Sequence, residues 1–405
     1  QDLHHPQPAG SGEGGQSVGI LTSDVISTGG NATMNRKLLV LLCLLLPSLA
    51  CQIIAPVTET VTETQPNETQ AVVENTPVCK PVLPPKKPEK NKYQTIVEPF
   101  EITAPSGNRI FGLIRRPDPD MHQQTCFPAV VLVPGGINPG RMMAYGREAK
   151  TLAGTGMVVV TFNAEGRVDD SPDDIRSEGT EDFNGYRHQE GLCAIVKHVM
   201  AIPTVIADNV GIATQSYGIT MGAGCAGRYP NVPIKYLVDG EGPPDSFVTC
   251  HGPRFLAGDM QKYTRVKEIF GRLAIWQDSS EENVAWWSER EAIRFIGDFR
   301  GYYLRLQARW DHAQPPEKES EITAFHHPEG WPGGGPAWWH NKHSADIVNA
   351  AVEGGVPWVR VNLPTQGNSI NAIYNADAMP VFLPGQLADK PWVVQAVLEM
   401  ARMGE

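Results

Sequence analysis

Two short apolar runs constrain the fold of this chain more than any other feature of its sequence. Residues 129–133 (AVVLV) and 157–162 (MVVVTF) are rich in β-branched residues and contain no charged residue. Runs of this kind predict strands that are buried on both faces of a sheet. The stretch 147–153 between them has a helical pattern. A strand, a helix and a second strand in this order favour a parallel pair joined by a crossover.

The same alternation continues toward the C-terminus. A Pro-Ser-Gly-Asn turn between 100–104 and 110–115 predicts a hairpin. Further helices are expected at 189–201, after the strand at 210–213, at 345–351 and at 391–403, and further strands at 210–213, 236–238, 303–307 and 358–361. We therefore expect an α/β domain over residues 98–405, with a mostly parallel, doubly wound sheet and helices on both faces.

The alternation is interrupted between about 245 and 300 by a helical stretch that contains Trp276, Trp286 and Trp287. This stretch predicts a small helical cap over the carboxyl edge of the sheet, and a plain surface insertion is the alternative. The tryptophans favour an apolar or aromatic acyl group or a sugar as ligand, although core packing explains them equally well.

The first 97 residues lack the alternating strand and helix pattern of residues 98–405. Residues 38–50 (LLVLLCLLLPSLA) follow the basic start Met34-Asn-Arg-Lys and are too short to span a bilayer as a helix. They have the pattern of a secretory signal, so Met34 is the expected start and residues 1–50 an upstream extension with a signal peptide. Residues 51–97 are dominated by Thr, Glu and Pro and predict an extended tether.

The cysteines and the net charge limit the partners. Ser-Leu-Ala-Cys51 resembles a lipoprotein cleavage box, so both membrane tethering through Cys51 and plain secretion stay open. The seven cysteines include no Cys-x-x-Cys pair, and their pairing cannot be deduced from their spacing. A formal net charge of −11 excludes a nucleic-acid surface as the default expectation.

The sharpest chemical signal surrounds Ser216. The segment Val210-Gly-Ile-Ala-Thr-Gln-Ser216-Tyr217-Gly218 runs from a strand through a serine flanked at two positions by small residues, and a glycine-rich helix follows. Such a turn forces the serine into a strained conformation and lifts its hydroxyl above a helix N-terminus. Thr214 stands where the G-x-S-x-G pattern has its first glycine, and an ordinary tight turn is the alternative interpretation.

Residues 98–405 resemble the α/β-hydrolase family in this turn and in two further strand ends. Val133-Pro134-Gly135-Gly136-Ile137-Asn138-Pro139-Gly140 resembles the oxyanion loop of the family, and the turn at 162–167 (FNAEGR) resembles its next strand end. The resemblance implies that Ser216 is a nucleophile and that the N–H groups of Gly136 or Ile137 and of Tyr217 stabilise the oxyanion. It also implies acyl transfer to water without a cofactor.

The family's acid follows a strand after the cap. Asp311, in the loop after 303–307, matches that position, and Asp239 at the end of the preceding strand is the alternative. Asp239, Glu241 and Asp245 form an acidic run that allows a cation site as a weaker interpretation.

The histidine base departs from the family's pattern. The family places this base after the last strand, but residues 362–386 contain no His. We rank His343 first, because we expect it to precede a helix whose N-terminus faces the carboxyl edge of the sheet, and His312 second. Residues 326–343 are rich in aromatic residues and glycine. They contain four histidines: His326, His327, His340 and His343. We expect this region to line or close the site. Its His spacing matches no zinc motif, so we expect no metal at the site.

These observations predict an exported serine hydrolase that acts on a small-molecule or polymer-linked ester. An ester is favoured over a peptide because no residue pattern predicts a pocket for a charged peptide end. Two alternatives remain: a binding protein on a hydrolase scaffold, suggested by the missing final-loop His, and a metal-dependent hydrolase.

Overall fold

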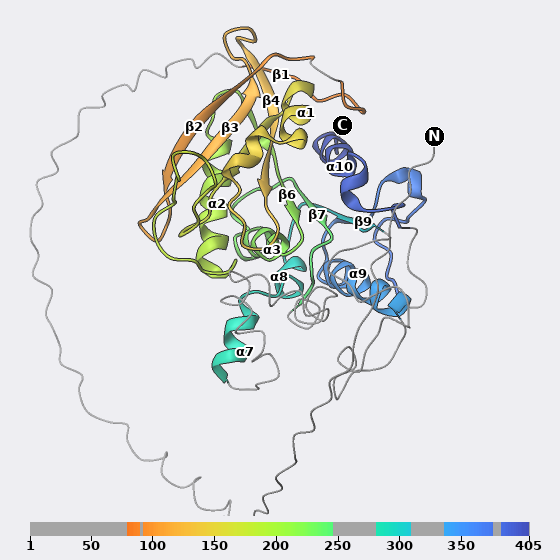
Figure 1. The fold of residues 1–405 in the computed structure, drawn as a ribbon. Helices are drawn as coiled ribbons and strands as arrows, with labels where there is room; N and C mark the ends of the chain where they lie inside the picture. Colours follow the sequence, from red (N-terminus) through yellow and green to blue (C-terminus); the bar gives the residue numbers. More distant parts are fainter. Residues whose placement is uncertain (1–78, 90–91, 246–280, 309–335, 376–381, 405) are drawn as a thin grey trace, which may run out of the picture. The chain divides into compact units, whose positions relative to one another are not determined.

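A computed structural model describes residues 79–89, 92–245, 281–308, 336–375 and 382–404 (Figure 1). Nine strands within these ranges form one sheet, in the order β2-β3-β5-β4-β6-β7-β8-β9, and β1 pairs with the start of β4. The strands are β1 Lys80–Pro81, β2 Thr95–Thr103, β3 Arg109–Pro117, β4 Thr125–Val133, β5 Val158–Phe162, β6 Val205–Gln215, β7 Tyr236–Gly240, β8 Tyr302–Leu306 and β9 Trp358–Val361.

β3 is the one strand on the path from β2 to β9 that runs against its neighbours. β2 and β3 form the predicted antiparallel hairpin, and β3 is also antiparallel to β5. From β5 through β4 to β9 all neighbours are parallel. The carboxyl ends of these strands therefore meet at one edge, where parallel α/β sheets place their ligands. The predicted mostly parallel sheet is confirmed.

Helices cover both faces of the sheet. Their bounds are α1 Arg147–Thr155, α2 Tyr186–Met200, α3 Gly218–Arg228, α7 Glu281–Ser288, α8 Ile293–Ile296, α9 Pro336–Glu353 and α10 Trp392–Ala401, and the 3-10 helices are η1 Arg141–Tyr145, η6 Pro364–Gln366 and η7 Leu387–Asp389. Residues of α2, α3, α8 and α9 share one hydrophobic core, and those of α1 and α10 share the other.

The central strand β4 explains this two-sided packing. Val131 and Val133 belong to the core under α2 and α3, whereas Val130 and Leu132 belong to the core under α1 and α10. Successive side chains of a strand point to opposite faces, so an uninterrupted apolar run supplies both cores. This is why a run without polar alternation predicts a strand at the centre of the sheet.

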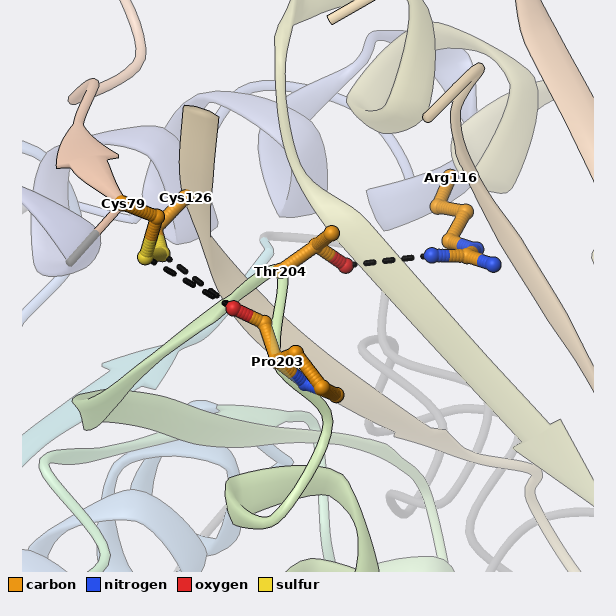
Figure 2. The surroundings of a disulfide bond; sticks show 5 residues. All are labelled: Cys79, Arg116, Cys126, Pro203 and Thr204. Carbon is orange, nitrogen blue, oxygen red and sulfur yellow. Dashed lines mark hydrogen bonds between the residues drawn. A yellow bond between two sulfur atoms is a disulfide. The ribbon is translucent and has the colours of Figure 1, made fainter. Parts of the chain in front are cut away.

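The folded region begins earlier than its composition indicates. β1 pairs in parallel with β4, and a disulfide joins Cys79 to Cys126 at the same place (Figure 2). Both sulfurs lie near the Pro203 carbonyl oxygen, at 3.6 and 3.4 Å. Cys79 and β1 precede position 98, so residues paired with the sheet already occur within the range 51–97 predicted as a tether. Proline-rich composition hides this boundary because β1 has only two residues.

A second disulfide, between Cys193 and Cys225, joins α2 to α3. Both cysteines are buried, at 3% and 0% exposure. Cys51 and Cys250 lie outside the described residues. The cross-link fixes the helix that follows the serine turn against its neighbour on the same face of the sheet.

The predicted cap falls only in part on the described residues. Residues 246–280 lie outside them, while α7 and α8 confirm the helical character of residues 281–296. Trp287 is buried at 5% exposure and Trp286 is partly exposed; Trp276 lies outside the described residues. Whether this region caps the sheet stays a prediction. In the ranges that the structure describes, no helix combines the length and the apolar character needed to cross a bilayer.

Candidate active site

The predicted serine turn lies between β6 and α3. Ser216 has a φ of 50°, in the left-handed region that residues other than glycine rarely adopt. Its N–H donates to the Gly240 carbonyl oxygen at 2.7 Å, and its own carbonyl accepts from the Ile219 N–H at 3.0 Å. These bonds hold the strained residue between the edge of β7 and the first turn of α3. Ser216 is only partly buried, so it lies at the carboxyl edge of the sheet and not inside the core.

The turn is possible only because its neighbours are small. A Cβ atom added to Gly218 would lie 2.5 Å from the Pro134 carbonyl oxygen. A Cβ added to Gly135 would lie 3.1 Å from the Ser216 Cβ. The segment after β4 therefore passes directly beside the serine, and this close approach leaves no room for a side chain at Gly218 and little room at Gly135.

Thr214 occupies its unusual position because Gly222 leaves room for it. Thr214 is buried at 3% exposure, and a Cβ added to Gly222 would lie 2.5 Å from the Thr214 Cγ2. The space that the G-x-S-x-G pattern provides through its first glycine is provided here by a glycine one turn into α3. The sequence departs from the motif while the local backbone geometry is retained.

The predicted oxyanion residues are next to Ser216. Gly136 has a φ of 60°, which favours glycine, and the Asn138 N–H and Nδ2 both donate to the Gly135 carbonyl oxygen, at 3.3 and 2.9 Å. Gly136 and Ile137 are partly exposed. Within the described ranges neither of their N–H groups donates a hydrogen bond. These two backbone donors directly follow Gly135, the residue that approaches Ser216, and their catalytic role stays a prediction.

The alternative acid, Asp239, belongs to a buried ion pair. Its Oδ2 accepts hydrogen bonds from the Tyr303 hydroxyl at 2.8 Å and from Arg305 Nη1 at 2.6 Å, and its Oδ1 accepts from the Gly242 N–H at 2.9 Å. The Asp239 and Arg305 side chains are both 0% exposed. Burial and the Asp239 carboxylate together raise the pKa of Tyr303 well above its usual value. These contacts give Asp239 a structural role and argue against it as a catalytic acid.

A further polar network follows the ends of β8 and β9. Asn362 is 0% exposed with a φ of 59°. Its Oδ1 accepts from the Gln307 N–H at 2.8 Å, and its Nδ2 donates to the Gln307 carbonyl oxygen at 3.1 Å. The Ser344 hydroxyl donates to Gln307 Oε1 at 2.6 Å. Asn362, the first residue after β9, therefore holds the end of β8 in the region where the α/β-hydrolase family places its imidazole.

The structure brings only part of the predicted catalytic set together. Gln215, Gly240 and Leu306 are in register across β6, β7 and β8, so the chain leaves β8 about 10 Å from the serine turn, two strand spacings away. Asp311 and His312 follow this point and lie outside the described residues, as do His326 and His327.

His343 does not precede the helix as predicted. α9 begins at Pro336, so His343 lies within this helix and does not precede its N-terminus. His340 lies in the same helix. The Ser344 contact with Gln307 still places this part of α9 beside the end of β8, at the edge of the sheet that contains Ser216.

No protein-family model and no curated protein matches the chain. Among solved structures, the chain is similar to the acylaminoacyl peptidase of Pyrococcus horikoshii, with 15% identity and a TM-score of 0.47 over 75% of this chain and 41% of that chain. It is also similar to dipeptidyl peptidase 4 of Porphyromonas gingivalis, with 15% identity and a TM-score of 0.41 over 69% of this chain and 32% of that chain.

A third similar structure is acetyl xylan esterase 1 from a Thermoanaerobacterium species, with 14% identity and a TM-score of 0.38 over 59% of this chain and 76% of that chain. The chain thus spans less than half the length of the two peptidases. The strand order and the turn at Ser216 decide the fold. The chain has the α/β-hydrolase fold.

Sequence reasoning missed the polar cluster behind the serine turn of this α/β-hydrolase fold. Arg167, Asn184 and His188 are buried at 4%, 0% and 1% exposure. Arg167 donates two hydrogen bonds to the Glu181 carboxylate, both at 2.9 Å. Burial and the nearby Arg167 guanidinium lower the pKa of His188 well below its usual value, so its imidazole is neutral. The segment 163–188 contains no motif that predicts this cluster, because its members meet only when the loop folds back on α2.

The described part of the chain contains no set of side chains suited to bind a metal ion. Across the described ranges, no group of three or more His, Cys, Asp or Glu side chains is arranged to hold a metal ion. In the acidic run at 239–245, the Asp239 carboxylate is bound to Arg305. The cation interpretation of this run is therefore not supported by the observed contacts.

Proposed function

We propose that the protein is a serine hydrolase with Ser216 as its nucleophile. The observation that carries the proposal is the left-handed backbone of Ser216, partly exposed at the carboxyl edge of the sheet. A strained serine persists only where surrounding contacts enforce it, and such strain concentrates at functional sites. The adjacent loop adds the N–H groups of Gly136 and Ile137, which have no acceptor among the described residues.

The proposed reaction begins when Ser216 Oγ attacks the carbonyl carbon of an ester and gives its proton to an imidazole. The π electrons move to the carbonyl oxygen, where the N–H groups of Ile137 or Gly136 and of Tyr217 stabilise the negative charge. The intermediate collapses, the bond to the alcohol oxygen breaks, and the alcohol leaves with the proton from the imidazole. Water then attacks the acyl-serine in the same way and releases the acid.

We assign the imidazole to the segment between β8 and the first half of α9. This segment contains the candidates His343 and His312, together with Asp311 as the proposed acid. The support is positional, because the Ser344–Gln307 hydrogen bond at 2.6 Å ties α9 to the end of β8, and Asp311 follows that strand. Substitution of each His by Ala should identify the base as the variant with the larger loss of kcat.

We propose an ester as substrate, with an amide as the alternative. Hydrolysis of short-chain nitrophenyl esters and of peptide nitroanilides by the mature protein should be measured side by side. Ser216→Ala should abolish the activity, and Ser106→Ala, in the exposed hairpin turn, is the matched control that should keep it. Faster cleavage of the nitroanilides would assign a peptidase, and activity that survives Ser216→Ala but not a chelator would assign a metal-dependent enzyme.

A second function, ligand binding without catalysis, is favoured by one observation. The residue that follows β9 is Asn362, which is buried and bound to Gln307, and no His occurs in the rest of that loop. A serine without a base is a weak nucleophile near neutral pH. Failure of a fluorophosphonate to label Ser216 in folded protein would favour this second function.

We propose that the protein acts outside the cytoplasm. Its two disulfides among the described residues, Cys79–Cys126 and Cys193–Cys225, suit an oxidising compartment. Expression of the chain with its leader in bacteria fed labelled palmitate should distinguish the two expected forms. Label that is lost in Cys51→Ala would assign a lipid tether, whereas unlabelled protein in the soluble exported fraction would assign plain secretion.

A further inference from the structure

The side chain of Asn184 joins the two halves of the predicted oxyanion site. Asn184 lies just before α2, is fully buried and has a φ of 63°. Its Nδ2 donates to the Gly136 carbonyl oxygen at 3.2 Å and to the Tyr217 carbonyl oxygen at 3.0 Å. A primary amide has two N–H donors, and here one amide uses both, one on the loop after β4 and one on the residue that follows Ser216.

The first contact sets the direction of a predicted oxyanion donor. The Gly136 carbonyl and the Ile137 N–H belong to one planar trans peptide and point in opposite directions. When Asn184 holds the carbonyl, the Ile137 N–H points away from Asn184, and no described residue accepts its hydrogen bond. The orientation of the Ile137 N–H is thus fixed by the side chain of Asn184, which lies more than forty positions later in the sequence.

The second contact acts on the residue after the nucleophile. The Tyr217 carbonyl accepts from the Thr220 N–H at 3.3 Å in the first turn of α3 and also from Asn184. The Tyr217 hydroxyl donates to the Phe183 carbonyl oxygen at 3.3 Å. Tyr217 is therefore held at both its backbone and its side chain by the loop that carries Asn184, and its own N–H is the other predicted donor.

The amide of Asn184 is itself held in one orientation. Its Oδ1 accepts from Arg167 Nη2 at 2.6 Å, and because a guanidinium can only donate, Nδ2 must face the two carbonyls. Arg167 is fixed in turn by its bidentate pair with Glu181. The backbone N–H of Asn184 donates to the neutral His188 Nδ1 at 3.3 Å. Such a fully partnered buried network is rigid, as a positioning element must be.

We propose that Asn184 is the positioning residue of the oxyanion hole. It orients the Ile137 N–H through the Gly136 carbonyl of the same peptide, and it restrains Tyr217, the residue that carries the other N–H donor, through its carbonyl. This inference rests on the proposed function. Removal of one oxyanion donor costs about 10²–10³ in kcat in known enzymes. Asn184 variants keep both donors but lose their alignment, so we expect a fall of kcat by about 10–10² with KM changed less than about threefold.

The test uses two variants that tolerate the left-handed backbone. Asn184→Asp keeps an oxygen toward Arg167 but removes both N–H donors, and Asn184→Gly removes the whole side chain. Asn371→Gly is the matched control. Asn371 has a φ of 54°, and its side chain also bonds the backbone, accepting from the Val359 N–H at 2.7 Å and donating to the Pro357 carbonyl oxygen at 3.3 Å.

Three readouts separate positioning from loss of folded protein. Active sites are counted by fluorophosphonate titration, kcat and KM are measured per active site on a nitrophenyl ester, and Ki is measured for a boronic acid that forms a tetrahedral serine adduct. We expect kcat to fall and Ki to rise in parallel in both Asn184 variants. The Asn371→Gly control should lower stability while both values per active site stay at those of the wild type.

Two different results would overturn the inference. If either Asn184 variant folds and shows kcat and Ki per active site within threefold of the wild type, Asn184 does not position the oxyanion hole although the enzyme is a serine hydrolase. If the wild type neither hydrolyses the ester nor reacts with the fluorophosphonate, the proposed function fails, and the role of Asn184 fails with it.

Discussion

Exchange of Gly222 for alanine tests why a threonine can stand at position 214. The added Cβ would lie 2.5 Å from the Thr214 Cγ2 and 3.2 Å from the Leu237 Cδ1. Thr214→Ser removes Cγ2 and keeps the hydroxyl, so the shorter of these contacts disappears in the double variant. The clash with Thr214 should therefore depend on a single methyl group.

The expected changes in the free energy of unfolding follow from the typical effects of overpacking and of lost methyl groups. Overpacking of a core costs about 1–3 kcal/mol, and Gly to Ala in a helix interior gains about 0.5–1 kcal/mol. Gly222→Ala alone should therefore destabilise the fold by about 1–2 kcal/mol. Thr214→Ser alone loses one buried methyl, about 1 kcal/mol. The double variant should be more stable than the sum of the single changes predicts, by at least about 1 kcal/mol.

Urea unfolding of the four proteins, with disulfides intact, measures this coupling from the midpoints at a common m-value. The pair Thr220→Ser and Gly222→Ala is the matched control. Thr220 lies in the same helix, but none of its atoms is among those nearest the added Cβ, so the two changes in the free energy of unfolding should be additive. A coupling below about 0.5 kcal/mol between positions 214 and 222 would refute the explanation of the altered motif.

Three further predictions concern stability. Replacing the Cys79–Cys126 disulfide by two serines releases a loop with a sequence separation of 47 and should lower the free energy of unfolding by about 4 kcal/mol in urea; an unchanged midpoint would contradict this. Because the pKa of His188 is lowered in the folded state, the unfolded chain binds the extra proton below about pH 6.5, so stability should fall as pH decreases from there, by up to about 1.4 kcal/mol per pH unit. His188→Gln should lack this part of the slope. Asp239→Asn removes the buried carboxylate that pairs with Arg305 and should cost about 3–5 kcal/mol, whereas an effect below about 1 kcal/mol would show that the pair is not needed.

The sequence allowed the sheet and the serine turn to be predicted because both depend on local patterns. An apolar run such as 129–133 predicts a strand that is buried on both faces of a sheet, and the small residues Gly135 and Gly218 leave room where the loop after β4 passes the strained serine. These requirements are visible in neighbouring residues. The predicted oxyanion loop follows β4 for the same reason.

The rest of the site depends on contacts between distant segments. Asn184 meets Gly136 and Tyr217 only after the long loop behind β5 has folded, and no local pattern identifies this asparagine. Asp239 was an attractive acid by position, but the Arg305 that neutralises it comes from the next strand. The sequence pattern predicts a helix only from 345, whereas α9 begins at Pro336, so His343 lies inside the helix and not before it.

Peptide mapping of the fluorophosphonate-treated mature protein tests the central claim most directly. The account predicts a stoichiometric adduct on the peptide that contains Ser216, formed by folded protein, prevented by prior unfolding in urea and absent from Ser216→Ala. An adduct on a different serine, or none on folded protein with Ser216 intact, would contradict the claim that the strained turn after β6 presents a reactive hydroxyl.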